Sequence, residues 1–284
     1  MEGEKDEDRI SHLPDCLLGN IVSLLPVKNA ARTMALSHRW RHMWPSVPLD
    51  LDYIDGSSST NLGSHDQSII HRILSSHGDG PICRFNATIS AHEATSTWLL
   101  NLSNRHIDGS LVLKFVPHLA HPPLPRDLLR PSAGVLRHLE LHCCCLYHQP
   151  GVDLPLLSLH YLQLSNMCLA FGWKDKNAFG QWQPAADTIT CLNKRLKYME
   201  LHGYYGTVGE VQFASFLMAG AKALRAMRIM HGSKLRDERI NTMKYLILKG
   251  GKASSEAQVS FEWRSAIATN REDLENYVCK VSII

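Results

Sequence analysis

Residues 136–146 read LRHLELHCCCL, and this stretch decides the fold expected for the middle of the chain. Its leucines Leu136, Leu139 and Leu141 follow the pattern L-x-x-L-x-L. Leu139 and Leu141 alternate with Glu140, so an extended strand points the two leucines to one face and the carboxylate to the other. The pattern therefore predicts a strand with one buried face.

The same pattern returns three times further along the chain. Residues 159–169 read LHYLQLSNMCL, 196–201 read LKYMEL, and 224–229 read LRAMRI. The two longer copies fit the leucine-rich template L-x-x-L-x-L-x-x-(N/C)-x-L, with Cys144 and Met167 in the N/C position. A repeat of this kind cannot bury its apolar face alone and stacks on its neighbours. The copies begin 23, 37 and 28 residues apart, which predicts a short, irregular solenoid.

Composition and charge exclude several classes of protein. With 284 residues, 44% of them hydrophobic and 20% charged, the chain has the composition of a globular protein with more than one unit. No run of 18 apolar residues occurs, so no membrane partner is expected. The 30 basic and 27 acidic residues give a net charge of +3, which is too small to indicate a nucleic-acid partner. The acidic opening MEGEKDED and eight cysteines without a CxxC pair favour an intracellular, reducing location, in the nucleus or the cytoplasm.

The first 52 residues predict three short helices with more apolar surface than they can bury. A helix begins at Leu13-Pro14-Asp15, and Pro26 stops it. Its apolar residues surround the helix instead of forming one stripe, and two short neighbours cannot cover all of them. Either a partner protein or the rest of this chain covers the remainder.

Three segments in this region resemble a plant F-box: DRISHLPD at 8–15, LLPVK at 24–28 and LSHRWRHMW at 36–44. Asn29 departs from the pattern, because an acidic residue is common there. The resemblance implies that the unit docks on the Skp-family adaptor of a cullin–RING ubiquitin ligase. It implies that Leu13 and Pro14 insert into a groove of the adaptor.

The resemblance also assigns the other adaptor-binding residues by position. The main apolar contact would consist of Leu17, Leu18, Ile21, Leu24, Leu25, Pro26 and Val27. The third helix would be completed, partly as the unit's own core, by Ser37, Arg39, Trp40 and Trp44.

The C-terminal third alternates strand, helix and strand, and it has a resemblance of its own. The segments LKYMELHGYYG (196–206), FASFLMA (213–219) and ALRAMRI (223–229) resemble the FBD domain, which follows leucine-rich repeats in many plant F-box proteins. The expected fold class is α/β. The predicted organisation is an F-box at 8–52, a polar linker at 53–65, irregular leucine-rich repeats at 66–195, an FBD-like domain at 196–262 and a divergent tail at 263–284.

The strongest candidate for a metal site is HCCCLYH at 142–148. A structural zinc needs four converging ligands. Adjacent cysteines on a strand point to opposite faces, so at most two of the three, Cys143 and Cys145, could lie on the same face. The pattern therefore favours packing. His92-Glu93 begins like HExxH but has Ser96 in place of the second histidine. No catalytic, cofactor-binding or metal-binding residue is expected.

The leading hypothesis is a non-catalytic substrate receptor of an SCF-type ubiquitin ligase. Its expected partners are a Skp-family adaptor, a cullin bound through that adaptor, and a target protein that the sequence does not identify. Two alternatives remain open. The shortened repeat array could make the chain a non-degradative or decoy binding protein, and the histidine-rich middle could belong to a metal-dependent enzyme.

Overall fold

The structure is a computed structural model. It describes residues 10, 12–53, 67–89, 97–115, 124–125, 128–129, 132, 134–148, 158–171, 195–231 and 236–263. The described helices are α1 (Asp15–Ser23), α2 (Val27–Arg32), the 3₁₀ turn η1 (Thr33–Ala35), α3 (His38–Ser46), α4 (Gln67–His77), α5 (Thr97–Leu102), α6 (Val208–Gly220) and α7 (Asp237–Lys249).

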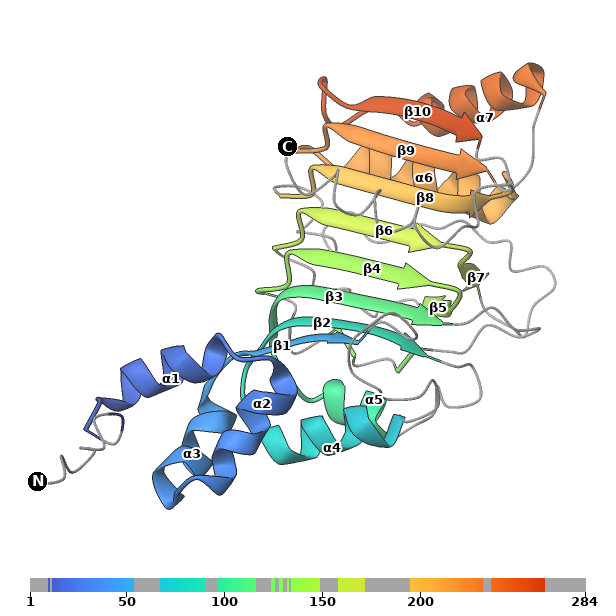
Figure 1. The fold of residues 1–284 in the computed structure, drawn as a ribbon. Helices are drawn as coiled ribbons and strands as arrows, with labels where there is room; N and C mark the ends of the chain where they lie inside the picture. Colours follow the sequence, from blue (N-terminus) through green and yellow to red (C-terminus); the bar gives the residue numbers. More distant parts are fainter. Residues whose placement is uncertain are drawn as a thin grey trace, which may run out of the picture.

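The described strands form one large sheet and one small one. They are β1 (Leu49–Tyr53), β2 (Ile82–Ile89), β3 (Ile107–Phe115), β4 (His138–His142), β5 (Cys145–His148), β6 (Tyr161–Ser165), β7 (Cys168–Phe171), β8 (Tyr198–Tyr204), β9 (Ala226–His231) and β10 (Gln258–Trp263). The large sheet has the order β1-β2-β3-β4-β6-β8-β9-β10, and every neighbouring pair is parallel (Figure 1). β5 and β7 pair separately, also in parallel. The predicted α/β class is confirmed.

The leucine pattern predicts the central strands and their buried face correctly. Leu139 lies opposite Leu162, and the rows continue across β8 and β9. The two buried rows consist of Leu139, Leu162, Met199 and Met227, and of Leu141, Leu164, Leu201 and Ile229. Glu140 alternates with the buried leucines and lies on the opposite face.

Helix α6 covers the buried face of the C-terminal strands, and it lies behind β8 and β9 in Figure 1. Phe213, Leu217 and Met218 are buried in the same hydrophobic cluster as the strand leucines. The helix begins at a capping box, in which Thr207 Oγ1 accepts a hydrogen bond from the backbone of Glu210 and the Glu210 carboxylate accepts one from the backbone of Thr207. The helix spans Val208–Gly220, and this box fixes its start.

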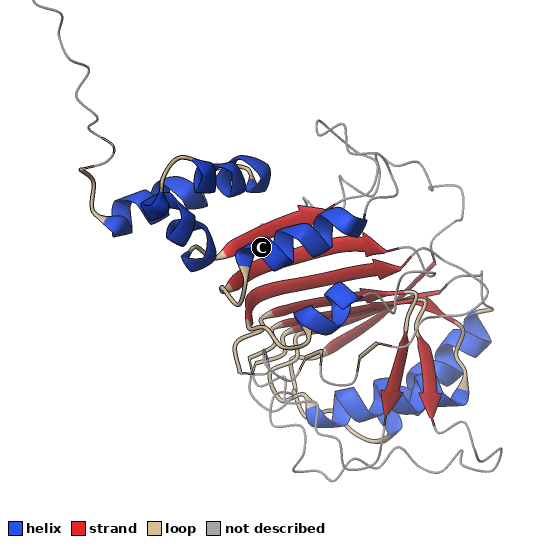
Figure 2. Cartoon of the chain, turned by 90° about the horizontal axis from the view of Figure 1, so that it is seen from below, coloured by secondary structure: helices blue, strands red, loops and turns tan. Residues whose placement is uncertain are grey.

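The helical unit α1 to α3 stands beside the sheet, next to the N-terminal end of the chain (Figure 2). Its second predicted helix is divided between α2 and η1, and Pro45 lies inside the last turn of α3. Only Val47 and Pro48 separate α3 from β1, which already belongs to the large sheet. The chain thus passes from helices to sheet before the predicted linker at 53–65, most of which lies outside the described residues.

A buried polar network fastens the helical unit to the sheet. Trp44 Nε1 donates to Ser76 Oγ over 3.3 Å, and the Trp44 and His77 rings meet edge to face. Arg105 Nη2 lies 2.9 Å from His77 Nδ1. A guanidinium can only donate, so Nδ1 accepts and His77 is neutral with its proton on Nε2. That proton is donated to the carbonyl oxygen of Val47 over 2.8 Å.

This network predicts that mild acid weakens the fold. Burial lowers the pKa of His77 below its ordinary value of 6.5; the hydrogen bond to Val47 opposes this shift, and the charge of Arg105 adds to it. The unfolded chain therefore binds a proton more readily than the folded chain, so the stabilisation is complete above pH 6.5 and is lost as the pH falls. Urea unfolding should give a lower unfolding free energy at pH 5.5 than at pH 7.5, with a loss from this residue of at most about 1.4 kcal/mol, because pH 5.5 lies one unit below the ordinary pKa of histidine.

A variant isolates this contribution from that of the other histidines. His77→Gln keeps an amide donor for Val47 but has no titrating group, so its stability should fall less between the two pH values. Equal pH dependence of wild type and variant would exclude His77 as the source.

Candidate functional site

Helix α1 presents a row of large apolar side chains to water. Leu17, Ile21 and Leu24 are 45%, 38% and 85% exposed. Leu17 and Ile21 lie within α1 and Leu24 is its C-cap residue, and their spacing of four and three residues places all three on one side. We name them the leucine face. An isolated exposed leucine is ordinary, but three on one helical face are typical of a protein-interaction surface.

The opposite side of α1 holds the helical unit together. Leu18 and Val22 are fully buried, and they belong to a cluster that includes Trp40 and Trp44. The resemblance implies that Leu18 contacts a partner, but the structure places its side chain inside the unit. Leu18, Trp40 and Trp44 therefore support the leucine face from beneath.

The remaining apolar residues of the predicted site lie around this face. Leu13, Leu25 and Val27 are half-buried and pack against the core. Pro14 and Pro26 are exposed, and each immediately precedes a helix, α1 and α2. Proline fixes φ near the helical value, so both helices begin where these residues stand.

The two polar residues of the predicted site have structural contacts. Arg39 Nε donates to Asp15 Oδ1 over 2.7 Å, and its Nη2 donates to the carbonyl oxygen of Leu13. Ser37 Oγ accepts a hydrogen bond from the backbone of Trp40 and caps α3. An exposed ion pair contributes little energy, so the consequence of the Arg39 contacts is positional: they hold the start of α1 against α3.

Sequence reasoning did not assign two exposed apolar residues, Ile10 and Leu36. Both lie inside the segments that carry the F-box resemblance, 8–15 and 36–44. The signal was thus present, although periodicity alone could not find it because neither residue lies within a described α-helix.

Of the metal candidate at 142–148, the structure describes the side chains of His142, Cys143 and Cys144. Cys144 is fully buried, and its Sγ lies 3.6 Å from Met167 Sδ. His142 lies on the open face of the sheet, with Nε2 at 3.6 Å from Glu140 Oε2. Burial raises the pKa of the Cys143 thiol, against a smaller opposing effect of its hydrogen bond with Asn166. Within the described ranges, no three His, Cys, Asp or Glu side chains come together as a metal site.

The open face of the sheet carries two carboxylates held by cationic or imidazole partners. His138 Nε2 lies 2.6 Å from Glu140 Oε1, and burial alone would raise the pKa of Glu140. The hydrogen bond with His138, together with His142 at 3.6 Å, outweighs burial and lowers that pKa far below its ordinary value. Glu200 has a matching arrangement, with His202 Nε2 at 2.9 Å and Arg228 Nη1 at 3.5 Å. Both carboxylates are thus internally paired.

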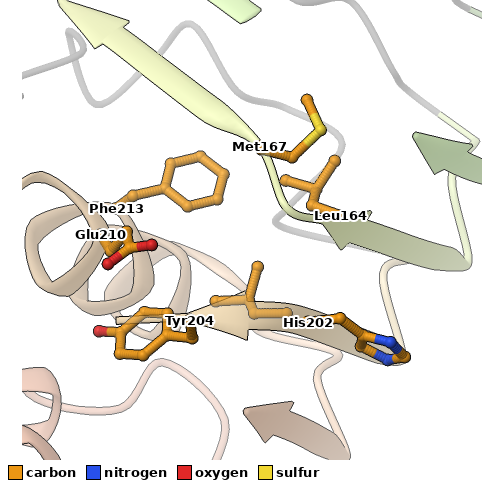
Figure 3. A pocket seen from close by; sticks show the side chains of 7 residues that line it. Leu164, Met167, His202, Tyr204, Glu210 and Phe213 are labelled. Atoms are coloured by element: carbon orange, nitrogen blue, oxygen red, sulfur yellow. The ribbon is translucent and has the colours of Figure 1, made fainter. Parts of the chain in front are cut away.

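A small cavity lies on the other face, between the ends of the central strands and α6 (Figure 3). Its volume of about 20 Å³ holds roughly one water molecule. Its lining residues are Leu164, Met167, Leu201, His202, Tyr204, Glu210 and Phe213. Burial, and to a lesser degree the charge of Glu210, raise the pKa of the Tyr204 hydroxyl well above its ordinary value. The cavity is too small for an organic substrate.

Among the helices that the structure describes, none has the length and apolar character that a membrane crossing requires.

Two family models match the chain at its two ends. The F-box domain model matches residues 10–52, and the FBD model matches residues 183–229. The first of these ranges contains the leucine face and all of α1 to α3, and the second contains β8, α6 and most of β9.

Several relatives from Arabidopsis thaliana combine the same parts. A putative F-box/LRR-repeat protein is 34% identical over 211 residues, which is 70% of this chain and 43% of the relative. An F-box/FBD/LRR-repeat protein is 30% identical over 163 residues, covering 56% of this chain and 35% of the relative. A second F-box/FBD/LRR-repeat protein is 33% identical over 162 residues, which cover 55% of this chain and 35% of the relative. The chain thus spans less than half the length of these curated relatives.

Proposed function

Because the chain belongs to the plant F-box proteins that combine leucine-rich repeats with an FBD domain, we propose that it is the target-recognition subunit of an SCF-type ubiquitin ligase. The observation that carries the proposal is the leucine face, which lies within the matched F-box region and is exposed to water. The partner we propose for it is a Skp-family adaptor, which links the chain to a cullin and its RING protein.

The proposed mechanism is proximity without catalysis by this chain. The helical unit holds the adaptor, while the sheet holds a target protein near the ubiquitin-carrying enzyme. Raising the effective concentration of the target is then the whole chemical contribution. We propose the nucleus or the cytoplasm as the location, since ubiquitin ligases of this type work there.

The large sheet fits a shortened repeat solenoid. Four copies of the leucine pattern supply four of its neighbouring strands, β4, β6, β8 and β9, in direct register. We propose that β4 and β6 belong to the repeat region at 66–195 and β8 to β10 to the FBD-like domain at 196–262. Both regions contribute to one continuous open face.

Reconstitution with purified components tests the proposal. The full chain should co-elute with a Skp-family adaptor on size exclusion and should bring a cullin into the same complex through that adaptor. With the ubiquitin-activating and ubiquitin-carrying enzymes added, a captured target should acquire ubiquitin. Capture without transfer would support the decoy alternative, and failure to co-elute with any Skp-family adaptor would refute the assignment.

A further inference from the structure

The four leucine-pattern strands share a second sequence feature. In each copy the residue after the first leucine is basic: Arg137, His160, Lys197 and Arg225. This position lies outside the alternation that buries the leucines, so neither burial nor strand pairing requires a basic side chain there. We name these four residues the basic ladder.

Backbone hydrogen bonds place the members of the basic ladder side by side. The N–H of His160 donates to the carbonyl of Arg137 over 2.8 Å, and the N–H of Lys197 donates to that of His160 over 2.9 Å. The N–H of Arg225 donates to the carbonyl of Lys197 over 2.8 Å. With strands about 4.8 Å apart, the ladder extends about 14 Å across the sheet. It follows the edge at which the strands begin, on the left in Figure 1.

The three charged side chains of the basic ladder reach solvent. Arg137 and Arg225 are exposed, and Lys197 is partly exposed. Within the part of the chain that the structure describes, no carboxylate forms an ion pair with these three side chains. Three of the four ladder residues thus carry a positive charge, and His160, whose Nδ1 lies 2.7 Å from the carbonyl oxygen of Ser158, stands between Arg137 and Lys197.

Rings stand one residue further along three of the four strands, at His138, Tyr161 and Tyr198, whereas β9 has Ala226 at this position. The rings of His138 and Tyr161 stack with centroids 4.4 Å apart, and Tyr198 lies opposite Tyr161 in the next strand. The Tyr161 hydroxyl donates to Gln163 Oε1 over 2.8 Å, which holds its ring in place. Fixed rings beside cations offer apolar contact area at low entropic cost, as in peptide-binding surfaces.

We propose that the basic ladder and these rings bind an extended, acidic segment of the target protein, lying across the starts of the strands. The inference rests on the proposed function, since it assigns the target's chemistry to the sheet. An extended peptide advances about 3.4 Å per residue, so about four or five residues cover the ladder. A nucleic acid fits less well, because the chain has a net charge of only +3 and the cationic edge is short.

Fluorescence anisotropy with the full chain tests this surface. The probe is a labelled decapeptide with glutamate at alternate positions and serine between them; its neutral counterpart has glutamine in place of glutamate. The acidic probe should bind saturably and the neutral probe should not. Arg137→Gln with Arg225→Gln should weaken binding at least about fivefold, as expected for two lost ionic contacts. Raising the salt from about 0.05 to about 0.5 M should weaken it further.

A matched variant controls for net charge. Lys244→Gln with Lys249→Gln removes two exposed positive charges from α7 and should bind the acidic probe as wild type does. Equal weakening by both double variants, or equal binding of the neutral probe, would overturn the proposal. Tighter binding of an oligothymidine of similar charge would overturn the peptide assignment. Adaptor capture, measured separately, should be unchanged in Arg137→Gln/Arg225→Gln, so failure here is distinguishable from failure of the proposed function.

Discussion

Leu17→Asp combined with Leu24→Asp is expected to abolish capture of a Skp-family adaptor while leaving the chain folded. Both side chains are exposed in the isolated chain, so a carboxylate at either position stays solvated and costs the fold little. In the complex each carboxylate would be buried against an apolar partner without a counter-charge. Central apolar anchors commonly cost 2 kcal/mol or more each, so affinity should fall at least about a hundredfold. Titration of purified adaptor by calorimetry measures the loss.

The chain offers a matched control on its other side. Val208 and Tyr245 are also large, exposed apolar residues, but they lie on α6 and α7. Val208→Asp with Tyr245→Asp changes charge and hydrophobicity to a similar degree and should leave adaptor affinity unchanged. Adaptor binding at wild-type strength by the α1 double variant, with an unaltered circular dichroism spectrum, would remove the leucine face from the site.

Leu139→Asp is expected to unfold the sheet. Leu139 is buried between Leu111 and Leu162 in the neighbouring strands, so an aspartate there has neither water nor a partner. Burying an uncompensated charge costs several kcal/mol, a large share of the 5–15 kcal/mol that stabilises a typical domain. Thermal unfolding monitored by circular dichroism should show the cooperative transition lost or lowered by more than about 15 °C.

Arg137→Asp is the control for this substitution. It introduces the same side chain two residues earlier in the same strand region, at an exposed position. Its unfolding free energy should stay within about 0.5 kcal/mol of wild type, as for most surface changes. Glu140→Ala is a poorer control, because Glu140 pairs with two histidines. Similar melting of Leu139→Asp and Arg137→Asp would show that the strand faces are assigned wrongly.

The central strands could be predicted because their signal is local. Leu139 and Leu141 precede and follow Glu140 in the sequence, and both are buried on the same face of the sheet. This alternation is visible within five residues of sequence. Strands β2 and β3 escaped prediction because they lack the leucine pattern. In β3 the successive residues Leu111, Val112 and Leu113 are all buried, so no two-residue period reveals the strand.

The candidate site shows a different limit. Sequence and resemblance identify α1, but they do not separate Leu18, which is buried, from Leu17, which is exposed. Apolar residues surround this helix, so its own pattern leaves the inward side undetermined. Packing against Trp40 and Trp44 decides it, and such contacts join residues more than 20 positions apart.

Under the proposed function, the short passage through Val47 and Pro48, braced by Trp44, His77 and Arg105, would decide which lysines of a target can be modified. Helices and sheet share one hydrophobic cluster, so a docked adaptor would fix the direction in which the basic ladder points. A bound target would then have one orientation, and only lysines on its side toward the ubiquitin carrier would be within range. Two targets that bind with equal affinity could therefore differ in whether they acquire ubiquitin. Two or three residues inserted at this passage would redirect modification to other lysines without changing either binding surface.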